Sequence, residues 1–190
     1  MRLTLDENEI ARLRCLIGSR SNCLELLGYV VDLDSREVHD SLRGSAEIAD
    51  REFEAFQILL SHYSKAERVR RGGRLVKFAD LSGGHAYEDA FLRRAVQPIA
   101  ETFGNLPEKL LERAEAFSGV FRNYGDCAVE ISALPNIPLV IIMWRADEFP
   151  ASATILFDES ANCYLPTEDL AVLGELTAAR LVMGLKNGLR

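Results

Sequence analysis

The sequence has few of the motifs that hold a metal ion or a nucleotide. None of its four cysteines lies in a Cys-x-x-Cys pair, which excludes the zinc-ribbon, ferredoxin and thioredoxin patterns. Its three histidines, His39, His62 and His85, are not spaced three or four residues apart, so no zinc-binding helix is predicted. The glycine-rich fingerprints G-x-x-x-x-G-K-[ST] and G-x-G-x-x-G are also missing. The motifs therefore predict no metal site and leave any cofactor unassigned.

Long apolar runs are scarce as well. The longest, from Pro138 to Trp144, is far too short to span a bilayer. The first residues, Met-Arg-Leu-Thr-Leu-Asp, become charged before any apolar run, so we expect no signal peptide. We therefore expect a cytoplasmic protein with four reduced thiols and no membrane partner.

Positive charge is in short supply. Lysine and arginine total 22 against 29 aspartates and glutamates, which gives a net charge of −7 and argues against nonspecific nucleic-acid binding. Hydrophobic residues make up 48% of the chain and charged residues 27%, both close to the averages of ordinary globular proteins. A length of 190 residues is typical of one domain, so we predict a single domain over residues 1–190.

Five segments carry apolar residues at helical spacing. A capping box formed by Asp6 and Glu9 opens the first, which should stop near Gly18. Asp50 is expected to cap the second and Thr167 the last. The five predicted helices cover about residues 7–17, 51–63, 86–103, 107–117 and 168–185.

The strand signal is clearest after residue 126. Cys127–Leu134 alternates, Leu139–Trp144 is continuously apolar, and the prolines between them indicate an antiparallel hairpin. We expect Leu139–Trp144 to be a central strand buried on both faces. Further strands are predicted at Ala153–Phe157, at residues 29–33 with a return at 37–39, and at residues 75–78. The fold class predicted is α+β, with an antiparallel sheet of three to five strands packed against about five helices.

Strand direction brings one set of polar residues together. Asp126 begins the first strand of the hairpin, and Arg145, Asp147 and Glu148 follow the second, so all four should lie at one end of the sheet. Asp158 ends the next strand and should lie at the opposite end. The three acids at the shared end are candidates for an acid–base pair or a hard-metal site. The alternative is that they are solvated turn residues.

A glycine turn forms the second candidate. Gly83 and Gly84 precede a predicted helix whose free amides could bind an anion, although a tight turn explains the same residues. His85 is the only histidine in a loop context, and we consider it as an acid–base group or axial ligand. Together with Tyr87, these residues are candidate ligand contacts. One hypothesis is that the glycine turn and the three acids face one shared cleft. The alternative is that they are unrelated turns at opposite ends, each serving local geometry.

Other residues are interpreted as structural. Cys127 could be a nucleophile only beside a base, and a buried inert thiol is the simpler interpretation. The basic run of Lys65, Arg68, Arg70, Arg71 and Arg74 could contact phosphate, but we interpret it as a solvated face, since it lacks interleaved aromatics. Trp144 and the other aromatic residues are assigned mostly to the core, and His62 to a structural position on its helix.

Five short blocks occur in order along the chain. They are Phe78–Tyr87, Gly125–Ala128, Asp147–Ala151, Ile155–Asp158 and Tyr164–Leu170. In this order they resemble a family of uncharacterised proteins from anaerobic bacteria and archaea, a domain of unknown function, over about Tyr29 to Leu176. The segment before Tyr29 matches poorly, so we divide the chain into an N-terminal helical segment (1–28) and a family-like core (29–190).

The resemblance implies a setting but no catalytic residue. Some members resemble fusions with the iron–sulfur module of corrinoid iron–sulfur proteins, which implies anaerobic one-carbon or corrinoid metabolism. The present chain lacks the cluster-binding cysteine run, so any cluster would sit on a partner.

Three functions follow as hypotheses. The first is a non-catalytic accessory domain that holds a small cofactor, of the tetrapyrrole or corrinoid type, or docks onto an iron–sulfur or corrinoid partner. The second is an enzyme that uses Asp126, Asp147 or Glu148 with His85 on a small polar substrate. The third is a protein-interaction module, for example a homodimer formed through the first or last helix. Whether the chain is an enzyme stays open.

Overall fold

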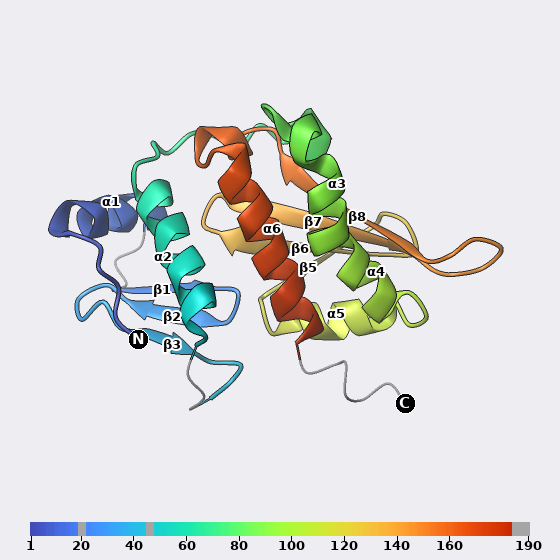
Figure 1. Ribbon diagram of the computed structural model, residues 1–190, viewed down its shortest axis with the longest axis horizontal. Coiled ribbons are helices and arrows are strands. Elements are labelled where there is room, and N and C mark those ends of the chain that lie inside the picture. Colours follow the sequence, from blue (N-terminus) through green and yellow to red (C-terminus); the bar gives the residue numbers. More distant parts are fainter. Residues whose placement is uncertain (19–21, 45–47, 184–190) are drawn as a thin grey trace.

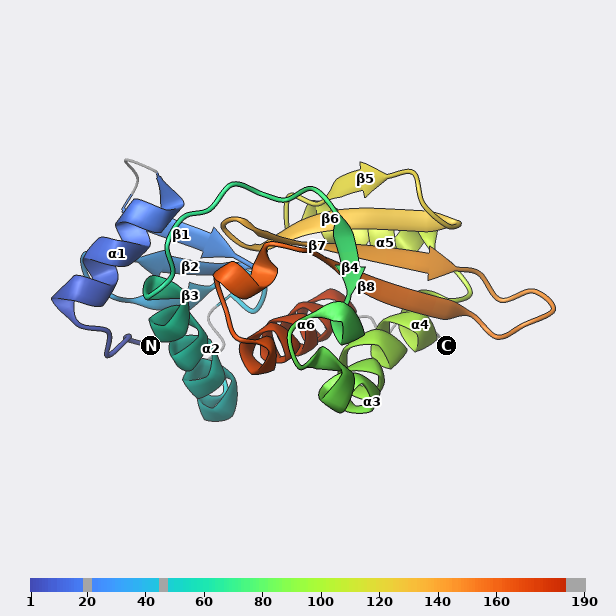
Figure 2. The same ribbon diagram turned by 90° about the horizontal axis from the view of Figure 1, so that it is seen from above.

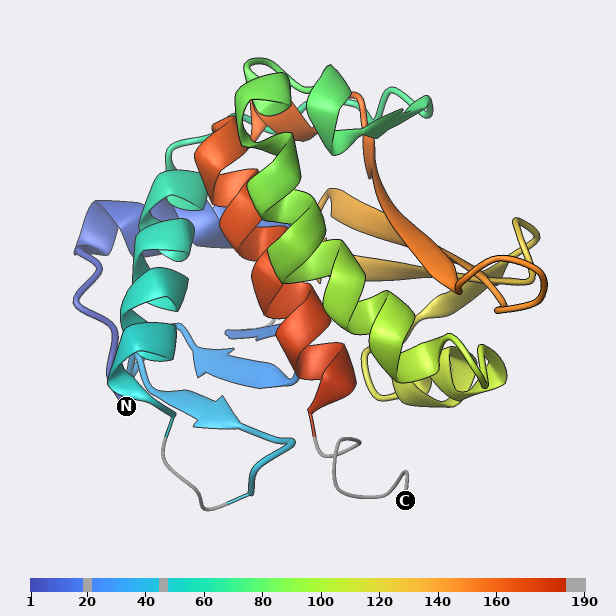
Figure 3. The ribbon, with the colours of Figure 1, turned by 45° about the vertical axis from the view of Figure 1, so that its right-hand side comes forward.

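The computed structural model describes residues 1–18, 22–44 and 48–183 and confirms the α+β class. Two antiparallel sheets are present, one of three strands and one of five. Helices α2 and α6 and the α3–α4 helix lie side by side, as Figures 1 and 3 show. Seen from above in Figure 2, α3, α4 and α6 cover one face of the five-stranded sheet.

The bounds of the elements agree with most of the predicted segments. The helices are α1 (Glu7–Ile17), α2 (Asp50–Ser64), α3 (Glu88–Phe91), α4 (Gln97–Phe103), α5 (Glu108–Glu115) and α6 (Thr167–Val182). A π-helical stretch, Leu92–Val96, joins α3 to α4 into one continuous helix, and short 3₁₀ turns occupy Phe78–Asp80, Gly84–Tyr87 and Ala161–Cys163. The predicted continuation of the last helix to residue 185 lies partly outside the described residues.

The first three strands along the chain form the small sheet, and the last five form the large sheet. The small sheet contains β1 (Cys23–Leu26), β2 (Tyr29–Asp32) and β3 (Val38–Asp40). The large sheet contains β4 (Leu75–Lys77), β5 (Val120–Arg122), β6 (Cys127–Leu134), β7 (Ile137–Trp144) and β8 (Ser152–Asp158), arranged as β4-β8-β7-β6-β5.

Of the three predicted helix caps, one is correct and two are wrong. At the start of α1, the Asp6 carboxylate accepts a hydrogen bond from the Glu9 amide at 2.8 Å, and Glu9 accepts one from the Asp6 amide at 2.9 Å. This capping box is confirmed, and Gly18 ends the helix with a φ of 64°. Asp50, by contrast, is the first residue of α2, and Ala49 is in the cap position. Thr167 is likewise the first residue of α6, with Pro166 in the cap position, so this cap prediction is also wrong.

Strand β7 is the centre of the large sheet. It pairs with β6 on one side and β8 on the other, and every residue from Ile137 to Met143 is buried. One face of the sheet contributes Ile141 to the main core, while Val140 and Ile142 belong to a small second cluster on the other face. The prediction of a central buried strand is confirmed, with one correction: Trp144, at its end, is 41% exposed.

The segment before Tyr29 contains more than a helix. Strand β1 forms a hairpin with β2 through the two-residue turn Leu27–Gly28, in which both residues have positive φ (49° and 80°). This is the twist that two-residue hairpins favour. The first residues also lie against the edge of the small sheet, since the Val38 amide of β3 donates to the Met1 carbonyl at 2.7 Å and Arg2 forms an isolated antiparallel bridge with Glu37. The description of residues 1–28 as helical is therefore incomplete.

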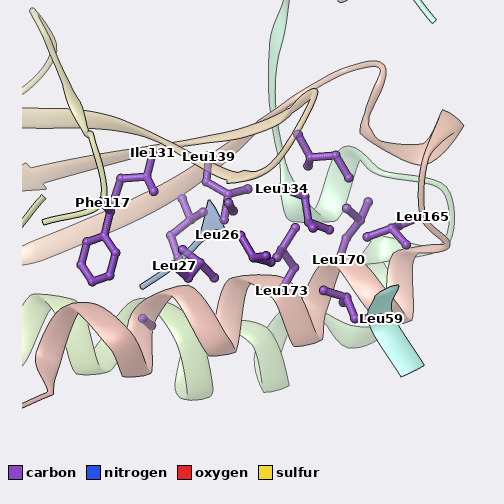
Figure 4. Packing of buried hydrophobic residues seen from close by; sticks show 14 of the residues in the cluster. Leu26, Leu27, Leu59, Phe117, Ile131, Leu134, Leu139, Leu165, Leu170 and Leu173 are labelled. Atoms are coloured by element: carbon purple, nitrogen blue, oxygen red, sulfur yellow. The ribbon is translucent and has the colours of Figure 1, made fainter. Parts of the chain in front are cut away.

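One hydrophobic core connects the two sheets. In Figure 4, Leu26 and Leu27 of the small sheet lie among Leu134 and Leu139 of the large one and Leu173 of α6. All five side chains are 3% exposed or less. The two sheets therefore share a continuous interior, in which leucine is the most frequent residue.

The cysteines agree with the prediction of reduced thiols. No disulfide joins Cys15, Cys23, Cys127 or Cys163, all of which lie in described segments. Cys127 is buried at the start of β6, and burial raises the pKa of its thiol. Because a thiol of raised pKa is a poor nucleophile, the structure supports the inert interpretation of this residue.

Candidate functional site

The predicted meeting of Asp126 with the end of β7 is present. The Arg145 amide donates to Asp126 Oδ2 at 2.7 Å, and the Asp126 amide donates to the Met143 carbonyl at 3.0 Å. Asp147 follows in the β7–β8 loop, where its Oδ1 accepts from the Phe149 amide at 3.1 Å. Asp126, Asp147 and Glu148 are all exposed at this end of the sheet.

Exposed aromatic side chains accompany these acids. Trp144 ends β7, Tyr124 lies in the β5–β6 turn, and Phe149 lies in the β7–β8 loop; they are 41%, 47% and 74% exposed. The turn packs close to Trp144, because a Cβ atom added at Gly125 would lie 3.3 Å from that indole ring. We call Tyr124, Asp126, Trp144, Asp147, Glu148 and Phe149 the aromatic–acidic end of the large sheet. The assignment of the aromatic residues mostly to the core is wrong for these three rings.

The charge of the aromatic–acidic end is not neutralised locally. Within the segments described, no lysine, arginine or histidine forms an ion pair with Asp126, Asp147 or Glu148. The nearest arginine in the chain, Arg145, directs its guanidinium to Glu108, with Nη2 and Oε2 3.0 Å apart. The surface therefore combines apolar rings with net negative charge.

The glycine turn lies elsewhere in the molecule. The Ser82 amide donates to Asn162 Oδ1 at 3.0 Å, and the Thr167 hydroxyl donates to the Ser82 carbonyl at 2.6 Å. Asn162 and Thr167 follow the Asp158 end of β8, whereas Ser152, at the other end, pairs with Trp144. The turn and the acids are therefore at opposite ends of the same strand.

The length of the continuous α3–α4 helix gives the distance between His85 and the three acids. The 3₁₀ turn that contains His85 leads directly into α3, and α4 ends at Phe103, beside the other end of the sheet. There, the Gly104 carbonyl accepts a hydrogen bond from the Ala146 amide at 3.4 Å. At about 1.5 Å per residue, the continuous helix spans more than about 20 Å. The shared cleft of His85 with the three acids is therefore wrong, since the helix holds them apart.

Packing explains why residue 84 is glycine, and backbone conformation explains why residue 83 is glycine. A Cβ atom at Gly84 would lie 1.9 Å from the Phe78 carbonyl oxygen, so only glycine fits. Gly83 has open space but a φ of 76°, which favours glycine. The side chain of His85 is 90% exposed, 3.6 Å from Glu88, and Tyr87 is also exposed. The structure places both side chains at the surface of the molecule.

A buried carboxylate was not recognised as a site from the sequence. Asp158 is 1% exposed, and its oxygens accept hydrogen bonds from the amides of Gly72 (3.0 Å) and Gly73 (2.8 Å) and from Ser160. Burial would raise the pKa of Asp158, but the hydroxyl and amide of Ser160 and the glycine amides outweigh it and lower the pKa to about 2.

Two arginines of the basic run form ion pairs, one of them with the same carboxylate. Arg71, from the segment between α2 and β4, lies with Nε 3.3 Å from Asp158 and donates through Nη1 to Glu130 at 2.9 Å. Arg74 pairs with Glu159 at 2.8 Å. All the basic residues of the run are exposed, as predicted for a solvated face, and Arg71 and Arg74 also pair with carboxylates at the sheet.

A second buried charged group lies between the small sheet and α6. Arg180 is 1% exposed, and its guanidinium donates to both oxygens of Asp40 at 2.6 Å. The guanidinium carbon also lies 4.3 Å from the centre of the Tyr29 ring. Burial would raise the pKa of Asp40, but the hydrogen bonds and charge of Arg180 outweigh it and lower that pKa. The sequence feature that could have revealed this buried pair is the single arginine within the apolar C-terminal half of α6.

His62 is paired rather than isolated. Its Nδ1 lies 2.6 Å from Asp169 Oδ2, which joins α2 to the first turn of α6. This agrees with the structural interpretation of His62.

Over residues 1–18, 22–44 and 48–183, no group of three or more His, Cys, Asp or Glu side chains is arranged to hold a metal ion. In the same part of the chain, no helix is both long enough and apolar enough to cross a bilayer.

Comparison with known proteins gives a family and nothing closer. No curated protein and no solved structure matches the chain. The family described as "Domain of unknown function (DUF3786)" matches residues 9–180. The match begins inside α1, so most of the segment before Tyr29, which we had separated from the family-like core, is part of it. The chain belongs to the DUF3786 family.

Proposed function

We propose that this chain is a non-catalytic accessory domain that docks, through its aromatic–acidic end, onto a basic segment of a partner protein. The observation that carries the proposal is that three exposed rings and three exposed carboxylates lie at one end of the large sheet, where no basic side chain of the described residues forms an ion pair with these carboxylates. Exposed apolar groups of this kind mark interaction sites.

The chemistry favours a basic partner. Lysine and arginine side chains pair with carboxylates and also stack on aromatic faces, so one cationic segment satisfies both kinds of group. Tryptophan and tyrosine are frequent at the energetic centres of interfaces. The net charge of −7 would speed the approach of such a partner.

The resemblance suggests a setting for this docking. The resemblance of some members to fusions with an iron–sulfur module suggests, as the partner, an iron–sulfur or corrinoid redox protein of anaerobic metabolism, in the cytoplasm. The enzyme hypothesis has less support, because it pairs His85 with acids at the opposite end of the sheet. The acids that remain are exposed, which favours binding over proton transfer.

The single tryptophan provides the experiment. Trp144 is the only indole in the chain, so its fluorescence reports on the aromatic–acidic end alone. We would titrate the protein with an alternating arginine–glycine decapeptide and, separately, with its glutamate counterpart. A saturable change with the arginine peptide only, weakened by salt, is expected.

Matched charge variants separate docking from general attraction. The double variant Asp147→Asn/Glu148→Gln should weaken binding about tenfold, in line with the loss of two charge-assisted contacts. The control Glu54→Gln/Glu67→Gln removes the same charge from exposed positions on and after α2 and should change affinity less than about twofold. Equal weakening by both variants, or no saturable signal, would contradict the proposal.

A further inference from the structure

A cavity of about 470 Å³ lies beside the C-terminal half of α6, separate from the aromatic–acidic end. Its apolar wall comes from α6 and the residue that follows it, and its charged wall from Arg43, Glu52 and Arg180. The apolar residues are Leu176, Ala179, Val182 and Met183. The volume is within the range of small-molecule sites.

Most of the charged wall is already paired. Arg180 donates to Asp40 through both terminal nitrogens and to the Leu27 carbonyl through Nε at 2.9 Å. Glu52 accepts a hydrogen bond from the Tyr29 hydroxyl and lies 2.8 Å from Arg43 Nη1. These groups form a fixed polar wall rather than open binding positions.

Arg43 differs from its neighbours. Its Nε donates to the Met183 sulfur at 3.3 Å, and a thioether is a weak acceptor. The nearest carboxylate oxygen to this Nε, Asp40 Oδ2, is 3.5 Å away, longer than a charge-assisted hydrogen bond. Nη2 donates no hydrogen bond within the part of the chain that the structure describes. One edge of a half-buried guanidinium that lines the cavity is therefore weakly satisfied.

We propose that this cavity binds a small amphipathic carboxylic acid. The carboxylate pairs with the Nε–Nη2 edge of Arg43 in the two-bond geometry that guanidinium groups favour, replacing the thioether contact. The apolar body packs along Leu176, Val182 and Met183, and its removal from water supplies the rest of the affinity. A cationic ligand is disfavoured, because Arg43 and Arg180 line the same wall and Glu52 is engaged.

The lining also limits the cofactor class. No histidine or cysteine lines the cavity, and the thioether of Met183 is engaged by Arg43. A tetrapyrrole held through its metal therefore does not fit this cavity. The groups present recognise a carboxylate and an apolar body.

The test uses decanoate as the probe, with decanol and decylammonium as neutral and cationic counterparts. Isothermal titration below the micellar concentration should give one decanoate per chain, with decanol about tenfold weaker because it lacks the charge. Ala179→Phe, an exposed helical position on the cavity lining, should abolish binding while leaving the protein folded.

Arg43→Gln tests the head group. It should weaken decanoate about tenfold and leave decanol unchanged, whereas Arg93→Gln, at an exposed arginine of the α3–α4 helix, should change neither. Absence of decanoate binding, equal affinity for the three probes, or full affinity in Ala179→Phe would overturn the proposal. Because none of these residues belongs to the aromatic–acidic end, failure here leaves the docking proposal standing.

Discussion

Arg180 and Asp40 are 140 positions apart in the chain, yet two hydrogen bonds of 2.6 Å join them in the interior. The pair ties α6 to the end of β3 and so connects the last helix to the small sheet. A buried ion pair adds little net stability, but losing one partner leaves a buried charge without compensation.

Arg180→Met should therefore destabilise the protein by about 3–5 kcal/mol. Adding Asp40→Asn removes the orphaned charge and keeps an oxygen for the amides of Leu42 and Arg43, which now donate to Asp40. We expect the double variant to be more stable than Arg180→Met alone, measured by urea unfolding. If the two substitutions were simply additive, the pair would not be coupled as the structure indicates.

The pKa of Asp158 predicts a pH-dependent contribution to stability. Because its folded pKa, about 2, is below the unfolded value of about 3.9, ionised Asp158 stabilises the fold above about pH 4. This stabilisation, of roughly 2–3 kcal/mol, is lost as the pH falls through about 2. Asp158→Asn should be less stable than wild type at pH 7, and the difference should shrink between pH 4 and 2. A difference that stayed constant over this range would argue against the low pKa.

The two glycines of the turn should respond differently to alanine. Gly84→Ala places a Cβ against the Phe78 carbonyl and should cost more than about 3 kcal/mol, because backbone must move. Gly83→Ala meets no atom within 4 Å and should cost only about 1 kcal/mol, the strain of a positive φ. Thermal unfolding of both variants measures the difference, and similar costs would show that the close packing is not required.

Ile141 tests the central strand. Ile141→Asp puts an unpaired carboxylate on a fully buried position of β7 and should unfold the protein. Ser152→Asp, at an exposed position on neighbouring β8, is the control and should change stability by less than about 1 kcal/mol. Circular dichroism and melting temperature distinguish the two. A folded Ile141→Asp variant with an unchanged melting temperature would refute the placement of β7.

The sequence was sufficient to predict those structural features whose physical cause lies within a few neighbouring residues. The box of Asp6 and Glu9 lies within four residues, and the β6–β7 hairpin is specified by two apolar segments around a short turn. Strand direction alone then placed Asp126 beside Arg145. The two-residue hairpin at Leu27–Gly28 was missed, because leucine is an unusual residue at positive φ.

The tertiary structure decided which polar and aromatic residues are buried and which meet. Whether Trp144 is covered depends on what packs over the end of β7, and the separation of His85 from the acids depends on the direction of the α3–α4 helix. Arg180 with Asp40, and Asp158 with Gly72 and Gly73, join positions at least 85 residues apart. Local periodicity reports which side of an element is apolar, but it carries no information about the partner on the opposite element. Such pairs form only when the whole chain closes around its core.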